Sequence, residues 1–185
     1  MTMEDDQRIE LLRVARAAID RELAGDPSVV TSEVVFPAGL GGAFVTLRRD
    51  GRLRGCIGTF RAKSTLVETV ESVARTSCRD SRFATDPVTA EELPRVTIEL
   101  SVLGVLERAT DPAGLRVGEH GILVRRGEAS GCFLPQVAAE RGWSAEEFLG
   151  RCCSMKAGLP ADAWKEPATE VYVFTAEVFE EHGSH

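Results

Sequence analysis

The first apolar positions of the chain recur every three or four residues, which is the spacing of an amphipathic helix. They are Ile9, Leu12, Ala15, Ile19 and Leu23. The triplet Gly25-Asp26-Pro27 follows directly and supplies a helix stop. We therefore predict a helix over residues 5–23.

A β-hairpin is predicted around Asp50-Gly51, because this dipeptide supplies the two positive-φ residues of a type I′ turn. Apolar and polar residues fill the runs 43–49 and 52–60 on either side of it. With a two-residue loop, antiparallel pairing places Leu47 opposite Arg54, Val45 opposite Cys56, and Phe44 facing Ile57. Both faces carry apolar groups, so we expect the hairpin to lie centrally, covered on both sides.

Three further helices are predicted from their start signals. Thr65 with Glu68, and Ser144 with Glu147, have capping-box spacing, and Pro135 suits the first turn of a helix that runs to Glu140. The first of these three ends near Cys78 and is followed by a polar loop over 79–87. A short helical turn from Thr89 to Glu92 is expected to stop at Pro94.

Further strands are expected at 96–102, 121–125, 131–134 and 171–178. Tight hairpins and irregularly placed helices, without repeated βαβ units, indicate an α+β fold with a mainly antiparallel sheet flanked by helices. We expect one domain over residues 1–185, with flexible ends at 1–5 and 180–185.

Composition excludes several classes of protein. The chain has 185 residues, 43% of them hydrophobic, and its apolar stretches are too short to cross a membrane. The net charge is −7 and the basic residues are scattered, which disfavours a nucleic-acid partner. The acidic start of the chain does not resemble a secretory signal, so the cytoplasm is the expected location.

The cysteines and histidines argue against a disulfide framework and a multi-histidine metal site. An odd number of cysteines with irregular spacing predicts reduced thiols at Cys56, Cys78, Cys132, Cys152 and Cys153. Cys152 and Cys153 are adjacent, so we interpret them as helix-packing thiols. His182 and His185 lie in the last four residues, which leaves His120 alone in the body of the chain. We therefore expect no metal, and the sequence leaves the cofactor unknown.

Cys56 is the best single candidate for chemistry. Strand alternation places Arg54 on its face, and a nearby guanidinium favours the thiolate. Gly55 and Gly58 flank Cys56 and would let a ligand or another backbone come close. The alternative is a small buried cysteine beside a bulge, and spacing alone favours it, because free cysteine is among the most buried residue types.

The other candidates each have a structural alternative. Arg54 could hold an anion with two hydrogen bonds or form an ordinary ion pair, and His120 could act as a base or simply occupy a turn. Asp80 and Arg82 lie close together in the loop after the second helix, where an ion pair at the helix exit is the usual arrangement. Lys156 precedes Gly158, where it would complement a helix C-terminus.

The octapeptide Leu53-Arg54-Gly55-Cys56-Ile57-Gly58-Thr59-Phe60 resembles the hallmark of the AMME-syndrome candidate protein family, also called AmmeMemoRadiSam system protein A. Similar segments follow in the family's order from about Val34 to Phe179. They include Asp80-Ser81-Arg82-Phe83, His120-Gly121-Ile122, Leu134-Pro135-Gln136-Val137, Gly142-Trp143 and Lys156-Ala157-Gly158-Leu159. Ser81 departs from the family, which often has proline there.

The resemblance implies an α+β fold of a larger and a smaller subdomain, with the octapeptide near a cleft between them. It implies no established reaction, but it suggests a cytoplasmic pathway shared with Memo-like and radical-SAM proteins. The candidate catalytic residues are Cys56, Arg54 and His120. The candidate substrate-binding residues are Gly55, Gly58, Thr59, Asp80, Arg82 and Lys156.

Two functions are consistent with these residues. In the first, Cys56 performs nucleophilic or redox chemistry on a small anionic substrate, activated by Arg54 and His120. In the second, the same cleft belongs to a noncatalytic adaptor or a metabolite-binding module. A partly exposed, reactive thiol would distinguish the enzyme from the module.

Overall fold

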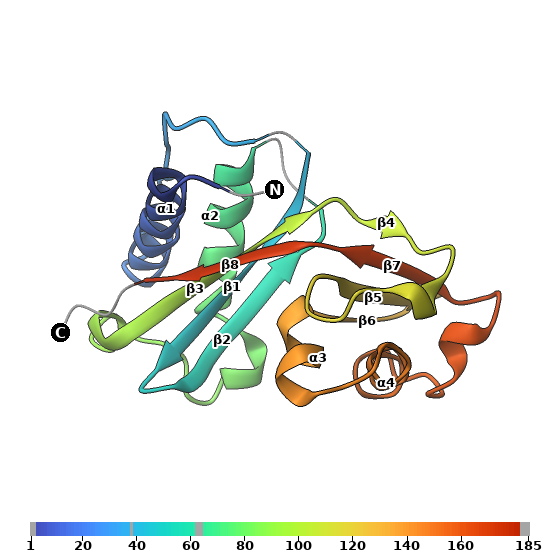
Figure 1. Ribbon diagram of the computed structural model, residues 1–185. Helices are drawn as coiled ribbons and strands as arrows, with labels where there is room; N and C mark the ends of the chain where they lie inside the picture. Colours follow the sequence, from blue (N-terminus) through green and yellow to red (C-terminus); the bar gives the residue numbers. More distant parts are fainter. Residues whose placement is uncertain (1–2, 38, 62–64, 182–185) are drawn as a thin grey trace. The chain divides into compact units, whose positions relative to one another are not determined.

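A computed structural model describes residues 3–37, 39–61 and 65–181 (Figure 1). The described chain forms two compact units, each with its own sheet and its own hydrophobic core. Unit 1 comprises 1–103 and 177–185, and unit 2 comprises 104–176. Both sheets contain antiparallel strand pairs and helices accompany each, so the predicted α+β class is confirmed.

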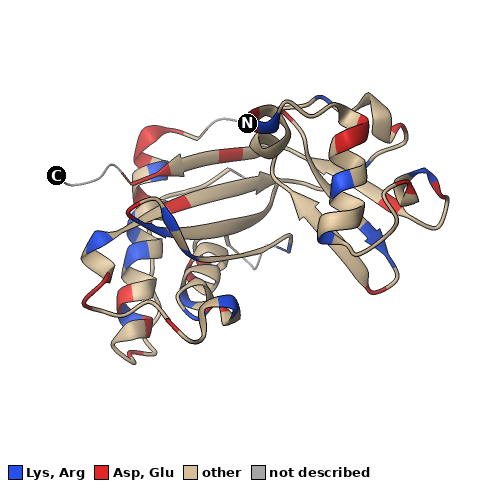
Figure 2. Cartoon of the chain, turned by 90° about the horizontal axis from the view of Figure 1, so that it is seen from below, with Lys and Arg blue, Asp and Glu red and all other residues tan. Residues whose placement is uncertain are grey.

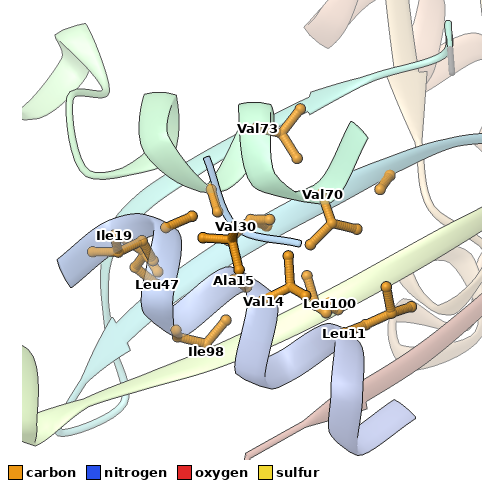
Figure 3. Packing of buried hydrophobic residues seen from close by; sticks show 14 of the residues in the cluster. Leu11, Val14, Ala15, Ile19, Val30, Leu47, Val70, Val73, Ile98 and Leu100 are labelled. Carbon is orange, nitrogen blue, oxygen red and sulfur yellow. The ribbon is translucent and has the colours of Figure 1, made fainter. Parts of the chain in front are cut away.

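Unit 1 contains a four-stranded sheet in the order β2-β1-β3-β8. The strands are β1 (Leu40–Arg49), β2 (Arg52–Thr59), β3 (Val96–Gly104) and β8 (Ala176–Glu180). Helices α1 (Asp5–Leu23) and α2 (Leu66–Ser77) pack against the sheet. Figure 3 shows Ile19 and Leu11 of α1 and Val70 of α2 directed toward Leu47 and Leu100 of the strands.

Unit 2 contains a second four-stranded sheet in the order β4-β7-β5-β6. Its strands are β4 (Glu107–Arg108), β5 (Gly121–Arg126), β6 (Ala129–Phe133) and β7 (Glu170–Phe174). Helices α3 (Pro135–Arg141) and α4 (Ala145–Arg151) cover the core, and a π-helical turn, Cys152–Lys156, continues α4. Cys152 and Cys153 are buried in that core, as expected for packing thiols.

The predicted helices are confirmed with their start signals. Helix α1 has the predicted bounds, and both Thr65 and Ser144 form complete capping boxes with the residues three positions later. The turn after Thr89 does not stop at Pro94, because Pro94 lies inside a 3₁₀ turn, Leu93–Arg95, where a missing N–H costs little. A second 3₁₀ turn, Ser81–Phe83, lies within the predicted polar loop.

The single closing strand predicted at 171–178 is wrong. The chain there forms two strands, β7 and β8, which belong to different sheets and are separated by Thr175. Thr175 accepts a hydrogen bond at its carbonyl oxygen from the Gly104 amide, at 2.9 Å. No glycine or proline interrupts residues 171–178, so the change of sheet at Thr175 leaves no turn signal in the sequence.

The two ends of the described chain contact the rest of unit 1. Met3 is buried, and its amide donates to Glu177 at 2.9 Å. The Glu181 amide donates to the Ile98 carbonyl at 3.0 Å. Residues 1–2 and 182–185, which the sequence also assigned to flexible ends, lie outside the described residues.

No described helix is both long and apolar enough to span a bilayer. In Figure 2, blue segments (Lys and Arg) and red segments (Asp and Glu) are interspersed along the chain.

Candidate functional site

The hairpin that carries Cys56 closes at the predicted turn but has a different register. Asp50 and Gly51 both have positive φ, and Arg49 pairs with Arg52, so the two-residue loop is confirmed. A β-bulge then shifts the register between Leu47 and Arg48. The predicted pairs are therefore wrong, and those observed beyond the bulge are Leu47 with Gly55, Thr46 with Cys56, Val45 with Ile57, and Phe44 with Gly58.

The bulge removes the argument that placed Arg54 beside Cys56. Arg54 has no partner in the β1–β2 ladder, because Leu53 pairs with Arg48 and Gly55 with Leu47. Strict alternation of side chains does not hold across an extra residue. The hairpin was expected to lie centrally, and this holds only for β1, an inner strand, because β2 is an edge strand of its sheet.

Arg54 instead forms a structural ion pair. Its guanidinium donates two hydrogen bonds to Glu92, at 2.7 and 3.0 Å, and one to Asp86 at 2.7 Å. Glu92 is buried, and Arg54 lowers its pKa, while the pKa of Arg54 is raised first by Glu92 and then by Asp86. Arg54 is thus the group that fastens the bulge to the loop before β3.

The main chain of Cys56 is held by the loop after α2. The amide of Cys56 donates to Oδ2 of Asp80 at 3.0 Å, and its carbonyl accepts from Arg82 at 2.9 Å. These two side chains occupy the donor and acceptor that an edge strand would otherwise leave exposed. The predicted cluster of Asp80 and Arg82 therefore exists, and it lies on Cys56.

Asp80 and Arg82 form a close ion pair in which only the arginine reaches solvent. Arg82 donates to Asp80 at 2.5 Å, and the Asp80 side chain is 2% exposed, against 58% for Arg82. Hydrogen bonds from Arg82 lower the pKa of Asp80 to about 2. The pKa of Arg82 is raised mainly by Asp80 and to a lesser extent by the Cys56 thiol. Arg82, not Arg54, is therefore the guanidinium that interacts with Cys56.

The thiol itself is half-buried and has one hydroxyl neighbour. Sγ of Cys56 accepts a hydrogen bond from the Thr46 hydroxyl at 3.4 Å. Alternation along β1 and β3 places Thr46 and Ser101 on the sheet face opposite Val45 and Leu100, which point into the helix-covered core. The Ser101 hydroxyl is buried and has no hydrogen-bond partner in the described part of the chain. Sequence reasoning missed both hydroxyls, although their positions in alternating strands could have indicated them.

The two glycines of the octapeptide allow close packing, Gly55 against a backbone carbonyl and Gly58 against an aromatic ring. A Cβ at Gly55 would lie 2.1 Å from the carbonyl oxygen of Ser77, and one at Gly58 would lie 2.2 Å from the Phe44 ring. The Thr59 hydroxyl accepts from the Arg61 amide at 3.0 Å and so shapes the end of β2. None of these three residues needs a ligand to explain its place.

His120 and Lys156 belong to unit 2. Nδ1 of His120 accepts a hydrogen bond from the Arg116 amide at 3.2 Å, in the turn before β5. Lys156 is exposed, and its ammonium lies 5.2 Å from the centre of the Phe133 ring. The residues that the structure brings together around Cys56 within unit 1 are Thr46, Asp80 and Arg82.

The cysteines and acidic residues show no metal centre. None of the five cysteines forms a disulfide, and burial raises the pKa of Cys78 to about 11 and raises those of Cys152 and Cys153 as well. The residues that the structure describes contain no group of three or more metal-ligating side chains. Cys56 and Cys132 are thus the cysteines with solvent access.

Comparison with known proteins identifies the relatives of this chain. The profile of the AMMECR1 family matches residues 12–179. The chain belongs to the AMMECR1 family. This confirms the resemblance carried by the octapeptide around Cys56. The site just described is therefore placed on a stretch of chain that lies inside the AMMECR1 match.

Individual relatives agree with the AMMECR1 assignment. A protein of Methanothermobacter thermautotrophicus is 42% identical over 188 residues, covering 96% of either chain. A protein of Thermococcus gammatolerans is 42% identical over 92% of this chain and 88% of its own. The crystal structure of the uncharacterised protein PH0010 from Pyrococcus horikoshii matches with a TM-score of 0.84 and 39% identity, covering 98% of this chain and 94% of its own. The fold is therefore shared along almost the whole chain.

Proposed function

We propose that this AMMECR1-family protein is an enzyme that uses the Cys56 thiol on a small anionic substrate, which Arg82 binds. The observation that carries the proposal is the arrangement of Arg82 beside Cys56, held by buried Asp80 and open to solvent. A fixed guanidinium favours a thiolate and also attracts an anion. Arg82 thus takes the role that the sequence assigned to Arg54.

Activation in this proposal comes from charge and not from a carboxylate base. Asp80 binds Arg82 and the Cys56 amide, and its pKa is about 2, so it is a weak proton acceptor at neutral pH. Following the family resemblance, we also propose that the reaction lies in a cytoplasmic pathway with Memo-like and radical-SAM proteins.

The test is the rate of Cys56 alkylation as a function of pH. Below about pH 8, Cys56 should react faster than the three buried cysteines, and Arg82→Ala should slow it about three- to tenfold, because the thiolate loses its positive neighbour. Arg82→Lys should retain most of the rate. Site-resolved mass spectrometry of iodoacetamide-treated protein measures each cysteine separately.

Arg54→Ala is the matched control. It removes a guanidinium that lies on the same strand as Cys56 but is bound to Glu92 and Asp86. It should leave Cys56 alkylation within about twofold of wild type. If Cys56 is inert in folded protein, or if Arg54→Ala slows it as much as Arg82→Ala, the proposed role of Arg82 is wrong.

A noncatalytic anion-binding role is the second candidate. The hydrogen bonds of Asp80 favour this noncatalytic role. Both carboxylate oxygens accept hydrogen bonds from the Cys56 amide or Arg82, so Asp80 is not available for proton transfer. In that case a small anion should bind with an affinity that depends on Arg82 and survives Cys56→Ser unchanged. An enzyme would lose turnover in Cys56→Ser.

A further inference from the structure

Three cations of unit 2 have no carboxylate partner among the described residues. Unit 2 is described in full and contains eight arginines and lysines. Five of them form ion pairs, namely Arg108, Arg116, Arg125, Arg126 and Lys165. The remaining three are Arg141, Arg151 and Lys156, and all three are exposed. In a chain of net charge −7, three unpaired cations in one unit call for an explanation.

All three unpaired cations lie on the same pair of aromatic rings. The guanidinium carbons of Arg151 and Arg141 are 4.6 and 5.4 Å from the centre of the Trp143 ring, and Lys156 approaches the Phe133 ring. The two rings meet edge to face, with centres 5.8 Å apart. We call these three cations and two rings the Trp143 cluster.

The backbone holds the rings and cations of the Trp143 cluster in place. Gly142, at a φ of 64°, ends α3, and the Ser144 capping box starts α4, so Trp143 is fixed between two helix ends. Phe133 stacks on Phe148, whose side chain is fully buried. The aromatic base of the cluster is therefore continuous with the core of unit 2.

The position of Lys156 depends on two unusual local features. It lies at the end of the π-helical turn, in which the Ala157 amide donates to the Cys152 carbonyl. A Cβ at Gly131 of β6 would lie 2.5 Å from the carbonyl carbon and the Cβ of Lys156, so the π-helical turn packs directly against this glycine. π-Helical turns are rare and occur often at functional sites.

We propose that the Trp143 cluster binds a small polyanion through its phosphate or carboxylate groups. A guanidinium stacked on an indole keeps its N–H donors in its own plane and pointing away from the ring. In this arrangement they can bond to the oxygens of a phosphate or a carboxylate. Lys156 adds a third positive charge. The proposal is independent of the Cys56 thiol, because each of its residues lies in unit 2.

Isothermal titration of the full chain with inorganic tripolyphosphate and with tricarballylate tests the proposal. At least one of these probes should bind, with an affinity that falls as salt rises. Arg151→Gln and Lys156→Gln should each weaken binding about tenfold, because each removes a charge-assisted hydrogen bond. Tighter binding of tripolyphosphate would assign a phosphorylated ligand, and tighter binding of tricarballylate a polycarboxylate.

Lys165→Gln is the matched control. Lys165 also lies over a tryptophan, at 5.0 Å from the Trp164 ring, but it has a carboxylate partner in Glu146. This variant should bind either probe as wild type does. Absence of binding by both probes, or equal weakening by Lys165→Gln, would overturn the proposal. Thermal unfolding of each variant verifies that a loss of binding is not a loss of fold.

Discussion

Gly55→Ala should lower the free energy of unfolding by about 3 kcal/mol, the upper part of the range for overpacked sites. The added Cβ would lie 2.1 Å from the Ser77 carbonyl oxygen, which belongs to the last residue of α2. A backbone atom cannot move aside without shifting the helix. Urea unfolding of the variant and wild type, followed by circular dichroism, measures the difference.

Gly58→Ala in the same strand is the comparison. Its new Cβ would meet the Phe44 side chain, 2.2 Å from the nearest ring atoms, and a ring can turn where a carbonyl cannot. We expect a loss of about 1 kcal/mol. Equal losses in the two variants would mean that the contact between Gly55 and Ser77 does not limit the packing of β2 on α2.

The elements that the sequence predicted well are those with local signals. The bounds of α1, both capping boxes and the Asp50-Gly51 turn depend on residues within a few positions of each other. Such signals determine where a helix starts or a strand reverses. They do not indicate which strands pair or in which register, and the wrong predictions concern strand pairing.

The register of the hairpin could not be predicted because distant residues decide it. Arg54 is excluded from the ladder and bonds Glu92, which lies 38 positions further on, while Gly55 packs on Ser77. A bulge at this point satisfies both contacts. Neither contact leaves a mark in the hydrophobic pattern of 52–60, so strict alternation was the natural expectation.

The same limit explains why the site was predicted only in part. The sequence pointed to Cys56, Asp80 and Arg82, but no local pattern indicates that Asp80 and Arg82 bind the main chain of Cys56. Arg82 takes the place of Arg54 as the candidate cation next to Cys56, because the bulge removes Arg54 from the ladder. Thr46 was missed because its importance depends on pairing with Cys56, and the predicted register paired Cys56 with Val45.

Asp80→Ala should lower the free energy of unfolding by about 2–4 kcal/mol, because it leaves the Cys56 amide and Arg82 without their shared acceptor. We expect a loss in the lower part of this range, because Arg82 stays in contact with water after its acceptor is removed. Asp80→Asn should cost less, since its amide oxygen can still accept from Cys56. Urea unfolding at neutral pH measures both variants.

The pH dependence of stability provides a second, independent measurement on Asp80. Its pKa is about 2 in the folded protein, against a usual value of 3.8, so the carboxylate stabilises the folded state above about pH 4. This contribution is lost as the pH falls from about 4 to 2. Allowing for the exposure of Arg82, it amounts to about 1–2 kcal/mol.

Wild-type protein should therefore lose more stability between these pH values than Asp80→Asn, in which the group cannot titrate. The difference isolates Asp80 from other carboxylates that share the acid range, such as Glu10, whose pKa is also lowered to about 2. Parallel curves for wild type and Asp80→Asn would show that Asp80 is not held as an ion pair in solution. Arg82 would then lack the anchor that places it beside Cys56, and the proposed activation of the thiol would lose its structural basis.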